Sequence, residues 1–304
     1  MKRRDFIRTT AAAGLSLPLI TPAFGKIHHP YVDQIGIQLY TVRNQMAEDP
    51  LATLKAIKEA GYDQVEGGDP ATYDKMTPML EDVGLTSRST FFPWPYLTGR
   101  WDLVKSEGME PAHSDFTGVV EHAQKLDMDY LVFGYMRKEE RQTLDDYHKI
   151  AEALNKAGEQ CNAAGIKLCY HNHAFEFEPI DGQVPYDILI EETDPDKMHF
   201  ELDVFWSSLA GHEPIPLMEK LGKRITLLHL KNKKEGTPLI YDEGTVPVDA
   251  FQELDDGVID IEKILLLAEE LGVEQCFVEQ DQSPDPIQSI AQSVDYLRSV
   301  EDKL

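Results

Sequence analysis

Histidines and carboxylates follow short apolar runs at four places in this 304-residue chain. The first place is 167–178, KLCYHNHAFEFE, where an apolar run gives way to His171, His173 and Glu176. A strand interior accepts such polar groups only when they are paired. Three later apolar runs also end in polar side chains: Asp203, His229 and Glu279. Four strands that end in this way indicate one shared site, lined by potential metal ligands.

An oxygen-rich set with one or two imidazoles suits a hard or borderline divalent ion, such as Mn, Mg, Co or Zn. One such ion could hold vicinal oxygens of a polyol and polarise a carbonyl, so that a carboxylate takes the proton from the neighbouring carbon. The residue types therefore favour a metal-dependent enzyme that abstracts a proton α to a carbonyl and forms an enediolate.

Each of these residues also has a structural explanation. Asp203 could cap a helix, and His229, which lies between leucines, could be a hydrogen-bonded core imidazole. Glu279 could simply pair with Lys231 or Arg43, and Glu66 could be a supporting carboxylate behind the site. Their joint occurrence at successive strand ends favours the functional interpretation.

The elements that position these side chains alternate between strand-like and helix-like patterns. Apolar runs such as 35–40 and 167–171 predict strands, and amphipathic stretches such as 50–60 and 261–271, each followed by Gly, predict helices. Eight strand–helix pairs predict an α/β fold, the (β/α)8 TIM barrel, as one catalytic domain over 30–304. An open doubly wound sheet is the alternative, but no glycine-rich phosphate loop follows the first strand.

Two long insertions, 93–111 and 232–257, fall on the barrel face where active sites lie. Trp94 in the first insertion and Trp206 after the sixth strand could pack as core or lid, or could stack against a sugar ring. Whether the second insertion closes over the site or packs against a second subunit stays open at this point.

Composition excludes several classes of partner. Lys and Arg number 29 against 54 Asp and Glu, a formal net charge of −25, which argues against a nucleic-acid or anionic-membrane surface. The same charge disfavours a strongly phosphorylated substrate. The chain has three cysteines and no CxxC spacing, which argues against a disulfide framework and against a metal site built from cysteines.

The first 25 residues differ from the rest. Arg3-Arg4 precedes a modestly apolar stretch, 11–20, and small residues follow at 22–25. This pattern resembles a twin-arginine (Tat) signal peptide, which predicts an exported or periplasmic protein with no stable membrane insertion after signal removal. The apolar stretch is shorter than the roughly 20 residues of a membrane span.

The chain resembles the xylose isomerase-like TIM-barrel superfamily, a group described as sugar phosphate isomerases/epimerases. The resemblance covers residues 33–300. It rests on motifs that are specific for the superfamily but name no substrate: GIQLYTVR at 36–43, HNHAFEF at 171–177, ELD at 201–203, HLK at 229–231, GVID at 257–260 and VEQD at 278–281.

The resemblance implies one divalent metal ion held by Glu176, Asp203, His229 and Glu279. Many relatives place Glu directly at the end of strand five, where this chain has His171, so whether His171 or Glu176 is the strand-five ligand stays open. The resemblance further implies catalytic roles for Glu176, Glu279, His173 and Lys231, and substrate binding by Gln38, Arg43, Glu66, His171 and Trp206. A second departure is Asn232, where relatives often carry Asp.

These expectations favour a sugar isomerase or epimerase that acts on a free sugar or sugar derivative. One alternative is a lyase that uses the same enediolate step on a 3-keto-glycoside, and another is a non-catalytic periplasmic sugar-binding barrel. A metal-dependent phosphodiesterase, as in the endonuclease branch of the superfamily, ranks last because of the charge. The expected partner is a small carbohydrate and not nucleic acid; a homo-oligomer stays open.

Overall fold

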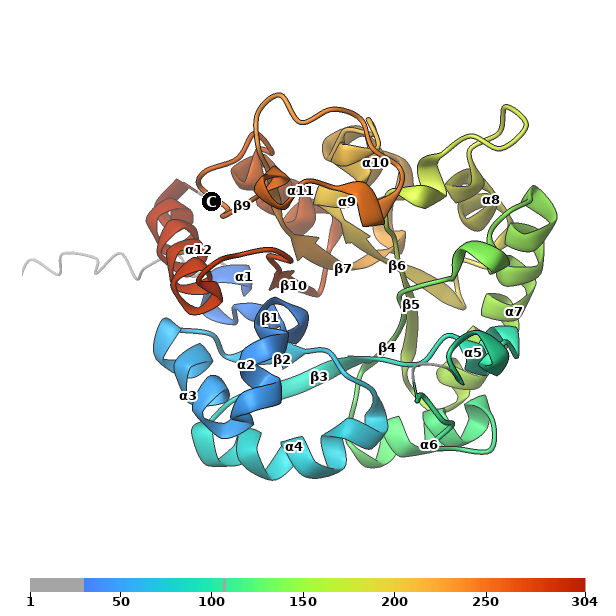
Figure 1. Ribbon diagram of the computed structural model, residues 1–304, viewed down its shortest axis with the longest axis horizontal. Helices are drawn as coiled ribbons and strands as arrows, with labels where there is room; N and C mark the ends of the chain where they lie inside the picture. The colour runs from blue at the N-terminus through green and yellow to red at the C-terminus, as the bar shows by residue number, and fades with distance from the viewer. Residues whose placement is uncertain (1–29, 106–107, 304) are drawn as a thin grey trace, which may run out of the picture.

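The computed structural model describes residues 30–105 and 108–303. Parallel strands close into a barrel in the order β1-β10-β7-β6-β5-β4-β3-β2, and helices surround it (Figure 1). This closed parallel barrel confirms the predicted (β/α)8 fold. The predicted export signal, residues 1–25, lies outside the described residues. The barrel strands are β1 (Gly36–Gln38), β2 (Gln64–Glu66), β3 (Thr86–Phe91), β4 (Tyr130–Phe133), β5 (Lys167–His171), β6 (Met198–Asp203), β7 (Ile225–Leu230) and β10 (Gln275–Val278).

Helix ends follow local sequence signals. The predicted helices at 50–60 and 261–271 are confirmed as α3 and α11. Each has an aspartate at its N-cap and a left-handed glycine at its C-cap, as helix-end chemistry requires. The helices are α1 (Pro30–Asp33), α2 (Arg43–Glu48), α3 (Pro50–Ala60), α4 (Pro70–Val83), α5 (Pro95–Thr98), α6 (Phe116–Lys125), α7 (Leu144–Ala163), α8 (Pro185–Glu192), α9 (Val204–Leu209), α10 (Pro214–Leu221), α11 (Ile261–Leu271) and α12 (Pro286–Val300).

The first strand is shorter than the sequence predicts. The prediction extended it over 35–40, but β1 ends at Gln38 and a 3-10 turn, η1 (Leu39–Val42), follows. The side chain of Gln38 accepts a hydrogen bond from the backbone N–H of Tyr40 at 3.2 Å and so caps the turn. As a result, Tyr40 and Arg43 lie at the mouth of the barrel and do not extend the strand.

Two apolar layers hold the barrel together. Residues that alternate along the strands divide between the barrel interior and the surrounding helices. The interior is filled by a small cluster that includes Cys169 and Phe277, while Tyr170 belongs to the large cluster between strands and helices. A Cβ atom at Gly36 would collide with the ring of Phe277, so this position needs glycine. The polar site described below therefore rests on a closed apolar floor.

The second long insertion is anchored near its ends. Two short strands, β8 (Asn232–Lys233) and β9 (Phe251–Gln252), pair antiparallel and bring its two ends together. Between them the chain forms 3-10 turns, η7 (Glu243–Thr245) and η8 (Val248–Ala250). In the part of the chain that the structure describes, no helix is long and apolar enough to span a bilayer.

Candidate active site

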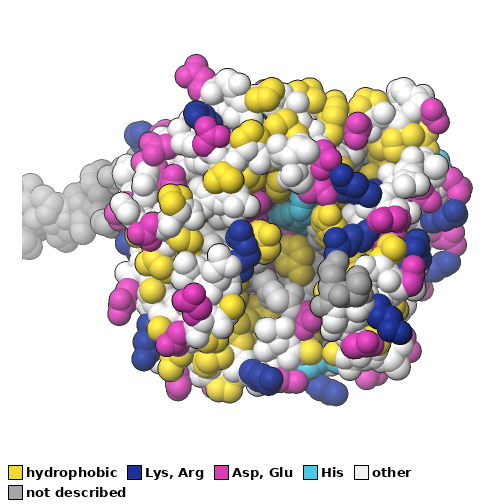
Figure 2. All heavy atoms as spheres, in the orientation of Figure 1, with side chains coloured by type: hydrophobic (Ala, Val, Ile, Leu, Met, Phe, Trp, Pro, Cys, Tyr) yellow, Lys and Arg dark blue, Asp and Glu magenta, His cyan; other side chains and the backbone are white. Residues whose placement is uncertain are grey.

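The carboxyl ends of the barrel strands surround a cavity of about 810 Å³. Figure 2 shows this face hollowed, with a histidine side chain visible inside the hollow. Eight of the predicted site residues line the cavity: Gln38, Arg43, His171, His173, Trp206, His229, Lys231 and Glu279. Of the other three, Glu66 and Asp203 are fully buried beside them, and Glu176 lies outside the cavity wall. The predicted strand ends do converge at one mouth, as the barrel geometry requires.

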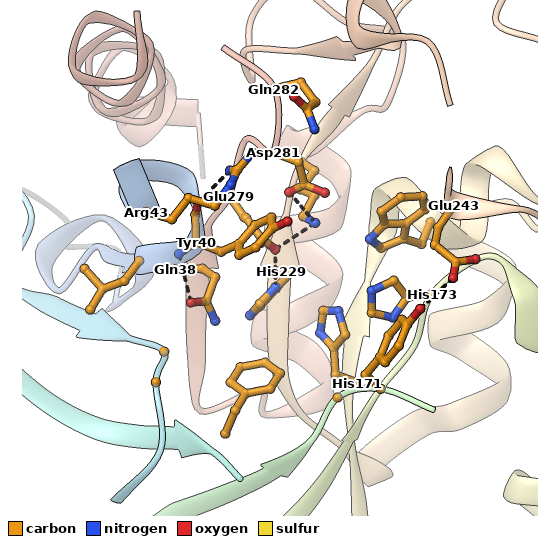
Figure 3. Close-up of a pocket in the computed structure, with 18 of the residues that line it drawn as sticks. Gln38, Tyr40, Arg43, His171, His173, His229, Glu243, Glu279, Asp281 and Gln282 are labelled. Atoms are coloured by element: carbon orange, nitrogen blue, oxygen red, sulfur yellow. Dashed lines mark hydrogen bonds and ion pairs between the residues drawn. The ribbon is translucent and has the colours of Figure 1, made fainter. Parts of the chain in front are cut away.

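His229 is the centre of the buried polar cluster (Figure 3). Its Nδ1 lies 2.8 Å from Glu279 Oε2, and its Nε2 lies 2.6 Å from Glu66 Oε2 and 3.3 Å from a carboxylate oxygen of Glu201. Burial alone would lower the pKa of His229, but the surrounding carboxylates outweigh burial and raise the pKa well above its usual value. The core-imidazole interpretation therefore holds in that the ring is buried and hydrogen-bonded, and the ring also borders the cavity, as its predicted role as a metal ligand requires.

Lys231 lies in a cage of three carboxylates. Its Nζ is 2.7 Å from Glu279 Oε2, 3.0 Å from Asp281 Oδ1 and 3.1 Å from Asp203 Oδ2. Burial opposes the charge of the ammonium group, yet the three carboxylates raise the pKa of Lys231 well above its ordinary value. The ammonium also lies 5.3 Å from the ring centre of Trp206. This part of the site therefore attracts positive charge strongly.

Asp203 serves two purposes at once. Its Oδ1 accepts a hydrogen bond from the backbone N–H of Trp206 at 2.9 Å and caps α9. Its Oδ2 faces Lys231 but has no hydrogen-bond partner of proper geometry among the described residues. The capping interpretation is thus confirmed for Oδ1, while Oδ2 stays available for the predicted role as a metal ligand.

The donor set fits a divalent cation. Ligand atoms of His171, Asp203 and His229 lie within 4.8 Å of one another, and so do those of a second group, Glu66, Glu201 and His229. Fully buried Asp203 and Glu201 each keep one oxygen without a hydrogen-bond partner in the described structure. Mixed imidazole and carboxylate donors are the ligands that Mn, Co and Zn accept.

The structure brings His171, and not Glu176, to this cluster. His171 faces the barrel interior, and its Nδ1 lies 3.0 Å from Glu201 Oε2. Glu176 instead accepts hydrogen bonds from the Tyr170 hydroxyl and the His173 backbone N–H, both at 2.9 Å. It belongs to neither ligand group of the described residues. Metal ligation and catalysis by Glu176 stay predictions that these contacts do not support.

Sequence reasoning missed three carboxylates of the site. Glu201 precedes Asp203 by two residues, so both side chains lie on the same face of β6, and this period of two could have revealed it. Asp281 follows Glu279 by two residues and was overlooked in the same way. Glu243 lies on the long insertion, and no local pattern marks it.

His173 and Trp206 form one wall of the cavity. Their ring centres are 5.2 Å apart, and the ring of Tyr135 lies 5.5 Å from that of His173. Burial is the main reason that the pKa of His173 is lowered to about 3, so its imidazole is neutral at ordinary pH. The wall therefore offers flat aromatic surfaces and uncharged polar groups.

A family model described as "Xylose isomerase-like TIM barrel" matches residues 54–300 of the chain. The chain belongs to this family. The match includes the ends of β2 to β10, and therefore most of the residues of the site. It also agrees with the resemblance that the strand-end motifs indicate.

The individual relatives are distant. An inosose dehydratase from Geobacillus kaustophilus is 30% identical over 93 residues, which is 31% of this chain and 30% of that protein. The chain thus spans about a third of that relative's length. A sugar phosphate isomerase/epimerase structure from Parabacteroides distasonis is 26% identical with a TM-score of 0.68, and the match covers 88% of this chain and 98% of that one.

A second similar structure was solved with a metal. The xylose isomerase-like TIM barrel protein from Mycobacterium smegmatis, solved in complex with magnesium, is 16% identical with a TM-score of 0.61. The match covers 91% of this chain and 99% of that chain. At this identity the likeness shows a shared fold.

Proposed function

We propose that this protein is a metal-dependent enzyme that removes a proton α to the carbonyl of an uncharged keto-sugar or polyol ketone, and that the resulting enediolate expels a β-substituent. His171, Asp203, His229 and Glu279 would hold one divalent ion, Mn, Mg, Co or Zn. When bound, the ion supplies positive charge beside the carbonyl oxygen.

In this proposal Glu279 is the base. Its carboxylate lines the cavity and is ionised, because Lys231 and His229 oppose the effect of burial and keep its pKa well below the usual range. The same two contacts weaken it as a base, so proton abstraction requires that substrate binding loosen at least one of them. The C–H bond breaks and its proton passes to Glu279. The electron pair then forms the new C=C bond, the β C–O bond breaks, and the departing oxygen takes up a proton from water.

Elimination is favoured over epimerisation by the opposite wall of the cavity. An epimerase needs a base and an acid on the two faces of one carbon. The predicted pair was Glu176 with Glu279, but Glu176 does not line the cavity, and the strand-five end presents the imidazoles of His171 and His173 instead. One strand-end base without its predicted counterpart suits a reaction in which a leaving group departs. The partial match to inosose dehydratases supports the same class.

Sugar isomerisation or epimerisation is the second candidate. It is favoured by the 26% identical isomerase/epimerase structure, which the chain covers almost completely. Both candidates begin with the same proton abstraction, so a single assay separates them through its product.

The test is proton exchange in D2O, read by NMR, after the metal content of the protein has been measured. A panel of free ketoses, inosose and 3-keto-glucosides is incubated with wild type and with Glu279→Gln. We expect deuterium beside a carbonyl and an unsaturated product only with wild type. A saturated, rearranged sugar would establish the isomerase instead. Absence of exchange with every member of the panel would refute the proposed chemistry.

We also propose that the reaction takes place outside the cytoplasm, because of the twin-arginine signal predicted in residues 1–25. Replacing Arg3 and Arg4 by Lys should retain the protein in the cytoplasm. Cell fractionation and immunoblotting measure the outcome, and unchanged distribution would contradict export by this route.

A further inference from the structure

Three residues on one wall of the cavity carry buried polar atoms without a hydrogen-bond partner among the described residues. These atoms are His173 Nδ1, Trp206 Nε1 and Glu243 Oε2. An unsatisfied buried donor or acceptor costs roughly 1–3 kcal/mol. Native structures seldom keep three such atoms around one cavity unless a ligand or water satisfies them.

The three side chains form a continuous surface. The ring of Trp206 lies beside that of His173, which in turn contacts Tyr135, and the Tyr135 hydroxyl donates to Glu243 Oε1 at 2.9 Å. Figure 3 shows His173 and Glu243 together on one side of the cavity, across from Gln38 and Arg43. One end of a ligand bound beside His229 would therefore point away from this wall, and its other end would contact the wall.

Glu243 is fixed through only one of its two oxygens. Oε1 accepts from Tyr135 and also from Arg141 at 2.6 Å. The guanidinium of Arg141 lies 3.2 Å from the ring centre of Phe175, and its side chain is only 5% exposed. Glu243 is thus oriented through Oε1, while Oε2 is buried without a hydrogen-bond partner among the described residues.

The long insertion between β8 and β9 forms part of the cavity wall. Glu243, Gly244 and Val246, all from the segment between β8 and β9, line the cavity. A neighbouring ion pair, Lys138 to Asp242 at 2.8 Å, fastens the same segment to the loop after β4. The insertion therefore forms part of the cavity wall and contributes Glu243 to it.

We propose that His173, Trp206 and Glu243 bind the hydroxyl groups of a neutral polyol, and that Glu243 is a specificity-determining residue. Glu243 Oε2 accepts a hydrogen bond from one hydroxyl, and the Trp206 indole N–H donates to another oxygen. His173 Nδ1 can accept or donate, according to its tautomer. The carboxylate would repel a phosphate at this end, so an uncharged substrate is selected.

The inference rests on the proposed function only in placing a hydroxylated substrate in this cavity, and its test needs no turnover. The test follows indole N–H signals by ¹H–¹⁵N NMR while myo-inositol or methyl β-D-glucopyranoside is added to the full chain with Mg²⁺. We expect the Trp206 signal to shift. Trp94 is an internal control, because its Nε1 is also buried and unpartnered among the described residues but does not line the cavity.

Glu243→Gln probes the acceptor directly. Its amide oxygen can still accept from Arg141 and Tyr135, while its NH2 group replaces Oε2 and turns an acceptor into a donor. We expect polyol affinity to fall about tenfold or more, the scale of one lost charge-assisted hydrogen bond. Asp249→Asn is the matched control: it breaks an exposed ion pair with Lys234 on the same insertion, at a residue that does not line the cavity, and should leave affinity unchanged.

Modified ligands separate binding from a merely structural role. Fluorine in place of the hydroxyl that faces Glu243 cannot donate, so one monofluoro glucoside should bind wild type about tenfold more weakly than its parent does. The same ligand should bind Glu243→Gln no more weakly than the parent glucoside does. The inference is overturned if Trp206 does not shift with either polyol. It is also overturned if no monofluoro ligand distinguishes wild type from Glu243→Gln.

Discussion

Two buried glutamates, one after β5 and one within the neighbouring strand β6, differ in the contacts that they make. Glu176, in the turn after β5, is 1% exposed, and Glu201, within β6, is fully buried. Burial is the main reason that the pKa of each is raised to about 8. By residue type, burial and acidity the two are indistinguishable.

Their partners distinguish them. Both oxygens of Glu176 accept hydrogen bonds, from the Tyr170 hydroxyl and the His173 backbone N–H, and neither bond among the described residues comes from an imidazole ring. One oxygen of Glu201 faces His171 and His229, and the other has no hydrogen-bond partner in the described structure. A satisfied carboxylate stabilises a turn, whereas an unsatisfied one among imidazoles indicates a site that a cation would complete.

The largest predicted effect compares catalysis in the two regions. Asp203→Asn removes the charge that faces Lys231 in the strand-end cluster, while Glu176→Gln keeps the shape of the turn. We expect proton exchange to fall about 10²–10³-fold in Asp203→Asn, the usual scale for losing one electrostatic group of an active site. Glu176→Gln should stay within about threefold of wild type.

The D2O exchange assay measures both rates under the same conditions. Equal losses in the two variants would mean that Glu176 acts in catalysis after all. In that case, the hydrogen bonds that hold it would have to rearrange when substrate binds.

A smaller effect concerns metal affinity. Glu201 touches the rings of His171 and His229 and would fix their orientation from below. Loss of such a supporting carboxylate typically weakens metal binding about 10–100-fold. We expect that loss for Glu201→Gln and none for Glu176→Gln, measured by calorimetric titration with Zn²⁺ or Mn²⁺. Unchanged affinity in Glu201→Gln would remove it from the site.

The barrel and most strand-end positions were predictable from the chain. Apolar strand-like runs and the glycines that follow the helices are local signals, and the predicted bounds of α3 and α11 agree with the structure. His171, His229 and Glu279 lie near the ends of such strands, where barrel topology brings them together.

Other features depend on contacts far apart in the sequence. Glu176 follows a strand end as an active-site residue would, but only the fold shows that Tyr170 holds it outside the barrel. Glu243 is more than 100 residues from Arg141, which orients it. The residues around Glu176 and around Glu243 in the sequence therefore do not predict where these two side chains lie in the fold.

The pH dependence of stability should separate Glu176 from an ordinary surface acid. Its pKa is about 8 when folded, against an ordinary value of 4.5, so between these pH values the folded state binds a proton that the unfolded state lacks. Stability is therefore lost as pH rises through this window, at up to about 1.4 kcal/mol per pH unit.

Glu176→Gln does not titrate and should not show this loss. Urea unfolding of both proteins at pH 5 and pH 8 measures the difference. We expect the variant to gain stability relative to wild type as pH rises; parallel curves would show that the carboxyl is not held in a raised-pKa environment.

The smallest effect tests a third buried polar group, Asn232, which follows Lys231 directly. Its Nδ2 donates to the Leu254 carbonyl at 2.7 Å and to the Ile259 carbonyl at 3.2 Å, and its Oδ1 accepts from the Ile259 N–H at 2.8 Å. Asn232 thus clamps the end of the long insertion, while Lys231 is oriented by carboxylates.

Asn232→Asp tests the clamp with a side chain of nearly the same shape. A carboxylate cannot donate a hydrogen bond, so the aspartate side chain of the variant would leave two carbonyl oxygens without a donor. We expect the free energy of unfolding of the variant to be lower by about 1–3 kcal/mol. We expect that loss in urea unfolding, with the proton-exchange rate of the folded protein changed little. A large fall in exchange without a fall in stability would show that Asn232 acts on Lys231 and belongs with the strand-end cluster. The reverse result would place it with Glu176, as a buried polar residue that serves the fold.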